Sequence, residues 1–259
     1  MFAPLRDVGR ALNDLPGWPS VGDLQRLAGR ERVSGAGVPL RFVEAGTQAR
    51  PGLSYEQRIF ESGEVVCRPE DWHDLFNALV WLAFPRAKAA LNARHVREMA
   101  REAPGKRGRA RDALTLFDEG GLIVASADRA LLQLIRDFRW KALFWQQRVE
   151  LTRRMRFFVF GHALYEKALA PFVGITASAA LLEVDDAFLA ADLRTQLAVA
   201  DCRAGEILAS EGLVRTPRDL SPVPLLGVPG WSPFSEDERF YENVDYFRPG
   251  RAHAGGGGR

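Results

Sequence analysis

The strongest constraint on the fold is a stripe of apolar residues that repeats with the period of an α-helix. The stripe covers residues 72–83 and recurs every three or four positions, which places its members on one helical face. Pro69 and the acidic Asp71 are typical of a helix start. Pro85 ends this helix, and a second helix is predicted over 86–101. Because such helices are stabilised mainly by burying their apolar face, the stripe predicts a helical core.

Hydrophobic patterns along the rest of the chain predict an α+β fold that is predominantly helical, with a short β-hairpin. After Thr216 the sequence is rich in Pro, Gly and aromatic residues, so we expect an irregular C-terminal wrap with its aromatic side chains packed inward. The other predicted elements are a helix near 21–27, a strand over 40–44, a hairpin from 113–117 and 122–125, a helix capped by Ser126, helical structure over 143–154, a strand over 157–160, a short helix over 161–169 and a long helix over 187–210.

Composition indicates one globular domain over 1–250, with an irregular lead-in over 1–39 and a disordered Gly-rich tail over 251–259. The chain has 259 residues, 47% hydrophobic and 26% charged, which excludes collagen, coiled coils and wholesale disorder. A net charge of +2 provides no overall field for nucleic acid or membrane surfaces. The two cysteines have no disulfide-type spacing, and no apolar run approaches the ~20 residues of a membrane span, so we expect a cytoplasmic protein without membrane partners.

Common catalytic and nucleotide-binding motifs are missing from the sequence. It contains no GxSxG, no GxxxxGK[ST], no HExxH and no GxGxxG that opens a helix. These absences disfavour α/β-hydrolases, P-loop nucleotide hydrolases and dinucleotide-binding enzymes, and they leave the cofactor unassigned.

Four blocks of sequence, in order, carry a family resemblance. They are Trp72–Asn77 with Trp81, Phe84, Pro85, Lys88 and Asn92; Arg111–Glu119; Gly161–Leu164 with Glu166; and Pro224–Trp231 continuing to Phe247 and Arg248. Together the blocks resemble the bacterial family of uncharacterised proteins catalogued as domain of unknown function 3025, over about residues 40–249. The family has no established activity, so the resemblance implies no catalytic residue.

Two pairs of polar residues at helical spacing are the best candidates for chemistry. His73 and Asn77 are four residues apart, as are His162 and Glu166, so each pair shares a helix face. Imidazoles and carboxylates from several elements are typical of a Zn, Mn or Fe site, or of a general acid–base pair. We predict His73, His162, Asp112 and Glu166 as ligands of a divalent metal (Zn, Mn or Mg), and Asp118, Glu119 and Asn77 as catalytic residues.

A basic stretch over 94–111 holds seven positive residues opposed only by Glu98 and Glu102. It is predicted to bind an anionic, phosphorylated small molecule through Arg107, Arg109 and Arg111, with Lys88 alongside. Two other interpretations remain open, namely a solvated loop with ion pairs and a contact with a nucleic-acid backbone.

Each candidate also has a purely structural interpretation. Asp118 can close an Asx-turn at the hairpin tip, and His162 can be a buried histidine bonded to a carbonyl. His95, flanked by arginines, is expected on a solvated face. Cys67 precedes the first helix, where a thiolate nucleophile is one option and a plain buried thiol the favoured one.

The leading hypothesis is therefore a cytosolic metal-dependent hydrolase in which a metal-bound water attacks an anionic substrate. The first alternative is a non-catalytic binding or scaffold protein, which predicts buried histidines bonded to backbone carbonyls and no concave pocket around them. The second is a nucleic-acid-binding module that uses the basic 94–111 stretch.

Overall fold

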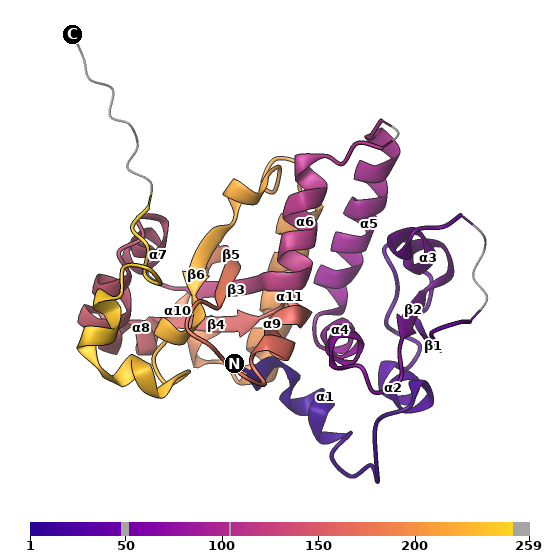
Figure 1. The fold of residues 1–259 in the computed structure, drawn as a ribbon, viewed down its shortest axis with the longest axis horizontal. Coiled ribbons are helices and arrows are strands. Elements are labelled where there is room, and N and C mark those ends of the chain that lie inside the picture. Colours follow the sequence, from indigo (N-terminus) through magenta and orange to yellow (C-terminus); the bar gives the residue numbers. More distant parts are fainter. Residues whose placement is uncertain (48–51, 104, 251–259) are drawn as a thin grey trace.

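The computed structural model describes residues 1–47, 52–103 and 105–250 and shows an α+β fold (Figure 1). The helices are α1 (Arg6–Arg10), α2 (Val21–Ala28), α3 (Tyr55–Ser62), α4 (Trp72–Ala83), α5 (Pro85–Arg101), α6 (Arg109–Gly120), α7 (Arg129–Arg136), α8 (Arg148–Arg154), α9 (His162–Lys167), α10 (Asp186–Ala190) and α11 (Leu193–Ala209). The strands are β1 (Arg41–Glu44), β2 (Glu64–Cys67), β3 (Gly121–Ser126), β4 (Met155–Val159), β5 (Thr176–Glu183) and β6 (Ser221–Pro224). None of the helices within the described ranges has the length and apolar character needed to cross a bilayer.

A mixed four-stranded sheet, in the order β4-β3-β5-β6, forms the centre of the larger part of the molecule. Strand β3 runs parallel to β5 and antiparallel to β4, with Leu122 opposite Val159. All six residues of β3 are buried, as expected for a central strand covered on both faces. Helices α6 and α11 pack against β3 and β5, and α5 lies against both of these helices.

A smaller lobe contains α2, α3 and the two-stranded parallel sheet β1-β2, and it lies beside α4 and α5 (Figure 1). The backbone of Gly35 touches α5 so closely that a Cβ there would lie 2.5 Å from the nitrogen of Ala93. Asn92 of α5 completes the contact, since its Nδ2 donates to the carbonyl of Glu56 at 2.9 Å and its Oδ1 accepts from the nitrogen of Gly35 at 3.2 Å.

The helical stripe is confirmed, because α4 spans Trp72–Ala83 and α5 follows from Pro85. Asp71 caps α4, with its Oδ1 accepting from the nitrogen of Asp74 at 3.0 Å. The predicted strands near 40–44 and 157–160 are β1 and β4, and the helix near 21–27 is α2.

The predicted hairpin over 113–117 and 122–125 is wrong. Its first half lies in α6, and only its second half is a strand, β3. The apolar residues Ala113, Leu114 and Phe117 are spaced at i, i+1 and i+4, so they also fit one helical face, and all three are buried there. The turn expected around Asp118 is therefore the last turn of α6.

Two other local predictions need correction. Asp128, not Ser126, caps α7, since its Oδ1 accepts from the nitrogen of Ala130 at 2.8 Å. The long helix predicted over 187–210 is divided into α10 and α11, and Asp192 caps the second of them. The predicted tail over 251–259 lies outside the described residues.

The C-terminal segment follows an irregular course that includes one strand, as its composition predicts. Tyr241, Tyr246 and Phe247 are buried there. Strand β6 forms one edge of the sheet and carries Pro222 and Pro224.

Asp201 of α11 caps the beginning of α5 from a neighbouring helix. Phe84, the residue before α5, provides no side-chain cap. The carboxylate of Asp201 instead accepts from the backbone nitrogens of Arg86 at 3.1 Å and Ala87 at 2.8 Å. Burial nevertheless dominates and raises the pKa of Asp201 to about 6.

The substitution Asp201→Asn is expected to stabilise the protein progressively more, relative to the wild type, as the pH rises from 4 to 8. The folded-state pKa of Asp201, about 6, exceeds the unfolded-state value of about 3.9. The free energy of unfolding therefore has its full contribution from protonated Asp201 below pH 4 and loses that contribution as the pH rises through 6. Asparagine is never charged and avoids that loss, which is on the order of 2–3 kcal/mol. Urea unfolding of both proteins at pH 4 and pH 8 tests this. A difference that is the same at both pH values would contradict it.

Candidate metal centre

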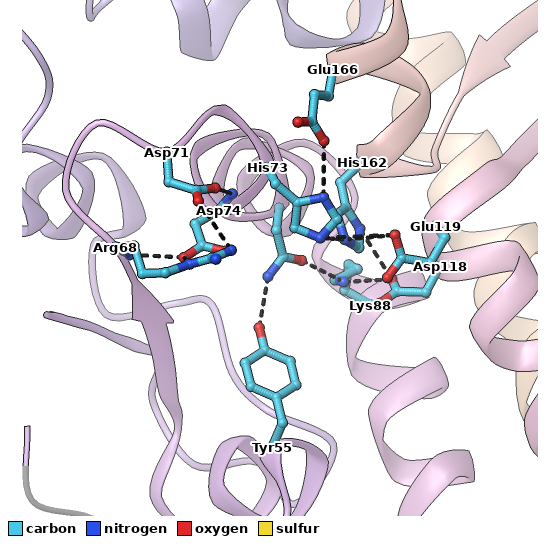
Figure 2. A network of polar contacts seen from close by, with 11 residues as sticks. Tyr55, Arg68, Asp71, His73, Asp74, Lys88, Asp118, Glu119, His162 and Glu166 are labelled. Atoms are coloured by element: carbon cyan, nitrogen blue, oxygen red, sulfur yellow. Dashed lines mark hydrogen bonds and ion pairs between the residues drawn. The ribbon is translucent and has the colours of Figure 1, made fainter. Parts of the chain in front are cut away.

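The packing of α4 against α9 brings the rings of two histidines into contact. His73 lies in the first turn of α4, and His162 is the first residue of α9. Their Nε2 atoms are 3.1 Å apart, and their rings meet edge to face with centroids separated by 4.5 Å (Figure 2). The two histidines singled out from the sequence therefore form one cluster, although 89 positions separate them in the chain.

Glu119, at the end of α6, provides the third group of the cluster. Its Oε2 is 3.4 Å from Nε2 of His162 and 3.8 Å from Nε2 of His73. Gly161 permits this approach, because the backbone before α9 lies directly on the α6–β3 junction. A Cβ on Gly161 would lie 2.4 Å from both the carbonyl oxygen of Glu119 and the nitrogen of Gly121.

These three separations fit a single bound cation. Zinc binds His nitrogen and carboxylate oxygen at about 2.0–2.1 Å, so ligand atoms around it lie about 3.3 Å apart in tetrahedral and about 2.9 Å apart in octahedral geometry. The observed distances of 3.1, 3.4 and 3.8 Å lie close to these values. His73, Glu119 and His162 are also the group whose ligand atoms lie within 4.8 Å of one another among the described residues.

Each histidine has a carboxylate behind it, on the side away from the cluster. Glu166 Oε2 lies 3.1 Å from Nδ1 of His73. Asp118 Oδ1 lies 4.0 Å from Nδ1 of His162. Metal-binding histidines commonly direct their second nitrogen to a carboxylate in this way, which fixes the tautomer and the ring orientation.

The tautomers implied by these contacts leave electron-rich atoms facing one another. Burial lowers the pKa of His162 to about 4, so the ring is neutral near pH 7. In the tautomers that carry both protons on Nδ1, the two Nε2 atoms present lone pairs to each other and to the carboxylate of Glu119. A proton on Nε2 of His162 would relieve this, but it would leave a bare Nδ1 facing the carboxylate of Asp118 in the interior. A cation relieves all three repulsions at once.

The charges around the cluster also favour a bound cation. Three carboxylates, Asp118, Glu119 and Glu166, surround the two histidines, and Asp118 forms an ion pair with Lys88. Burial, and then the charge of Asp118, raise the pKa of Glu119. Burial raises the pKa of Asp118, but the charge of Lys88, the neighbouring histidines and the hydrogen bond from Lys88 together outweigh it, so the pKa is lowered and Asp118 stays ionised.

A chain of hydrogen bonds continues from Asp118 to the smaller lobe (Figure 2). Lys88 Nζ donates to Oδ1 of Asp118 at 2.6 Å and to Oδ1 of Asn77 at 2.9 Å. Asn77 in turn donates through Nδ2 to the hydroxyl of Tyr55 at 2.7 Å. Tyr55 was not identified from the sequence, where no pattern marks it, since its contact with Asn77 depends on how α3 packs against α4.

The structure brings together seven of the predicted site residues and gives several of them a different place. Glu119, predicted to be catalytic, occupies a ligand position, whereas Glu166, predicted to be a ligand, lies behind His73. Asn77 and Asp118 contact Lys88 instead of facing the cluster opening. Lys88 is buried, so it is not exposed for substrate binding as expected.

Asp112 and the three arginines lie elsewhere. Asp112 is in the first turn of α6 and pairs with Arg107 at 2.9 Å. Ten residues separate Arg109 from Glu119 along this helix, or about 15 Å. Arg111 pairs with Glu102 at 2.6 Å. The structure therefore does not place these four residues at the cluster, and their predicted roles stay predictions.

The structure also settles two residues outside the cluster. His95 is buried, so its expected solvated position is wrong, and burial lowers its pKa to about 4. Cys67 is the buried last residue of β2, and burial raises the pKa of its thiol to about 12, which fits the favoured interpretation of an unreactive thiol.

The chain belongs to the family described as protein of unknown function DUF3025, whose sequence profile matches residues 40–251. The match includes every residue of the cluster and the hydrogen-bonded chain behind it. No curated protein and no solved structure matches the chain significantly.

Proposed function

We propose that this member of DUF3025 is a metal-dependent hydrolase whose divalent cation is held by His73, His162 and Glu119. The observation that carries the proposal is the convergence of two Nε2 atoms and one carboxylate oxygen at separations of 3.1–3.8 Å. Two imidazoles favour Zn or Mn over Mg, which prefers an all-oxygen environment.

The site is of the catalytic rather than the structural type. Structural zinc sites use four protein ligands, whereas catalytic sites use three and leave a position for water or substrate. The side chains of His73, Glu119 and Glu166 are 33%, 43% and 46% exposed, so one side of the cluster is open to solvent. When bound, such a cation lowers the pKa of a coordinated water to about 7 and polarises the bond to be cleaved.

The protein residues have separate tasks in this proposal. Glu166 holds the Nδ1 proton of His73 and thereby presents its Nε2 to the cation. In this proposal the second carboxylate oxygen of Glu119, at the open side of the cluster, accepts the proton of an attacking water. Arg107, Arg109 and Arg111 have no task at this centre, so the proposal does not depend on a phosphorylated substrate.

A purely structural role is less well supported by the contacts. Structural histidines are expected to bond backbone carbonyls, whereas His73 faces His162 and the carboxylates of Glu166 and Glu119. His162 faces His73 and Glu119 as well, but its ring also interacts with the backbone of Asp118. The basic stretch likewise offers few free charges to a nucleic acid, since Arg94, Arg101, Arg107 and Arg111 each pair with a carboxylate.

Addition of Mn²⁺ or Zn²⁺ to the chelator-treated protein is expected to raise its Tm by roughly 5–10 °C at a hundred times Kd. This corresponds to about 2.7 kcal/mol of added stability of the folded state in a chain of this size. His73→Ala and His162→Ala should each abolish the shift. His95→Ala, which removes a buried histidine outside the cluster, should retain it.

The same proteins then serve for activity. The metal-loaded wild type is expected to hydrolyse members of a panel of carboxylic and phosphate esters, and the two cluster variants should not. A Tm that no cation raises would overturn the metal site. A saturable shift without turnover of any ester would leave a metal-binding protein and overturn the hydrolase.

A further inference from the structure

The ammonium group of Lys88 is held from three directions in the interior. The side chain is 3% exposed and comes from α5. Its Nζ donates to Asp118 at 2.6 Å and to Asn77 at 2.9 Å, and it lies 5.2 Å from the centre of the Trp81 ring. These two charge-assisted hydrogen bonds and the cation–π contact together fix the orientation of the Lys88 side chain.

Stability alone gives a weak reason to bury this ion pair. Removing two charges from water costs about as much as their attraction returns, and well-packed apolar residues often stabilise as well or better. The side chain of Asp118 is 11% exposed, so both partners carry this cost. We therefore explain the buried ion pair by the position that it gives to the carboxylate of Asp118.

That position is directly behind His162. The oxygen of Asp118 that accepts from Lys88 is the same Oδ1 that lies 4.0 Å from Nδ1 of His162. Among the described residues Nδ1 of His162 has no hydrogen-bond partner, and the ring itself is buried. Oδ1 of Asp118 is thus the oxygen of that carboxylate directed towards Nδ1 of His162, although 4.0 Å is longer than a hydrogen bond.

We propose that Lys88 is a positioning residue of the metal centre, acting through Asp118 on His162. Lys88 keeps the carboxylate of Asp118 facing Nδ1, so that His162 carries its proton there and presents Nε2 to the cation. The same bond keeps Asp118 from turning into the cluster and binding the cation itself. This inference rests on the proposed metal site and adds to it a residue that touches neither cation nor substrate.

Asn77 and Tyr55 extend the arrangement to the smaller lobe. The bond from Nδ2 of Asn77 to Tyr55 fixes the orientation of the amide, so its oxygen faces Lys88. Tyr55 begins α3, and therefore the docking of this lobe on α4 contributes to the position of Lys88.

The test separates positioning from stability with the double variant Lys88→Met/Asp118→Leu. It replaces the ion pair by apolar residues of similar volume, and we expect a Tm equal to or above that of the metal-free wild type. The Kd for Co²⁺, measured by titration of its visible absorption, should rise by 10–100-fold, the usual effect of removing such outer partners. The absorption bands should also shift, because the orientation of one imidazole changes.

A matched control is Arg111→Met/Glu102→Leu, which removes a mostly buried ion pair between α6 and the end of α5 that has no hydrogen bond or ion pair to the cluster among the described residues. This variant should keep the wild-type Kd and bands. Asp118→Asn is a second, isosteric variant for the case in which the double variant does not fold, and its Kd should rise about tenfold.

The outcomes distinguish the two proposals. A wild type that does not bind Co²⁺ would overturn the metal site and the inference together. If the wild type binds Co²⁺ and either the folded double variant or Asp118→Asn has the wild-type Kd and spectrum, Lys88 has no positioning role and the proposed metal site stands.

Discussion

The single substitution Lys88→Met is expected to lower the free energy of unfolding by about 3–5 kcal/mol, the usual cost of removing one partner of a buried ion pair. Asp118 would keep its charge in the interior, or take up a proton, without the ammonium that now lies 2.6 Å away. The Tm should fall by roughly 6–20 °C at 2–4 °C per kcal/mol. Thermal and urea unfolding of the metal-free protein measure the effect.

Two comparisons make this result specific. Adding Asp118→Leu to Lys88→Met should restore most of the lost stability, because the uncompensated charge is removed. Lys141→Met removes a partly exposed lysine that pairs with the exposed Glu238 and Glu242, and it should change the Tm little. A single Lys88→Met variant as stable as the wild type would show that the interior tolerates a lone carboxylate at position 118.

The substitution Gly161→Ala is expected to disrupt both the fold and the metal centre. The added methyl would lie 2.4 Å from two backbone atoms at the α6–β3 junction, and backbone cannot move aside as a flexible side chain can. We expect a loss of about 3 kcal/mol, the upper range for overpacking. The cation-induced Tm shift should also disappear, since His162 and Glu119 would be forced apart.

Gly120→Ala provides the control for this variant. Gly120 is the last residue of α6, at the junction that Gly161 contacts, but a Cβ on Gly120 would meet no atom within 4 Å. Its stability and its response to Mn²⁺ or Zn²⁺ should match those of the wild type. If Gly161→Ala also matched the wild type, the close approach of the backbone at Gly161 to the α6–β3 junction would not determine the geometry of the cluster.

The elements that could be predicted from the sequence are those whose signal is local. The boundaries of α4 follow from its apolar stripe, from the cap at Asp71 and from Pro85. Residues 113–125 were misassigned because a short apolar run beside two glycines fits both a strand and a helix face. The correct choice depends on the buried sheet that α6 covers, and that sheet is formed by distant strands.

The candidate site shows the same limit. Helical spacing identified His73 and His162, but it paired each with a residue of its own helix. The pairs in the structure cross between helices, from His73 to Glu166 and from His162 to Glu119. His95 was misplaced because the neighbouring Arg94 indicates a solvated face, whereas that arginine is buried with its guanidinium bonded to Glu98 and to backbone carbonyls.

The two prolines of β6 limit how far the sheet can grow. Leu225, directly after β6, donates its N–H to the carbonyl of Ile175, directly before β5. In the alternating pattern of an antiparallel pair, the nitrogens of Pro222 and Pro224 are therefore directed outward. Proline has no hydrogen to donate there. The outer edge of β6 thus offers an incoming strand no N–H donors at these two positions. Another chain therefore cannot form a complete hydrogen-bonded ladder along this edge. The fold in this way carries its own protection against fibrous self-association along that edge.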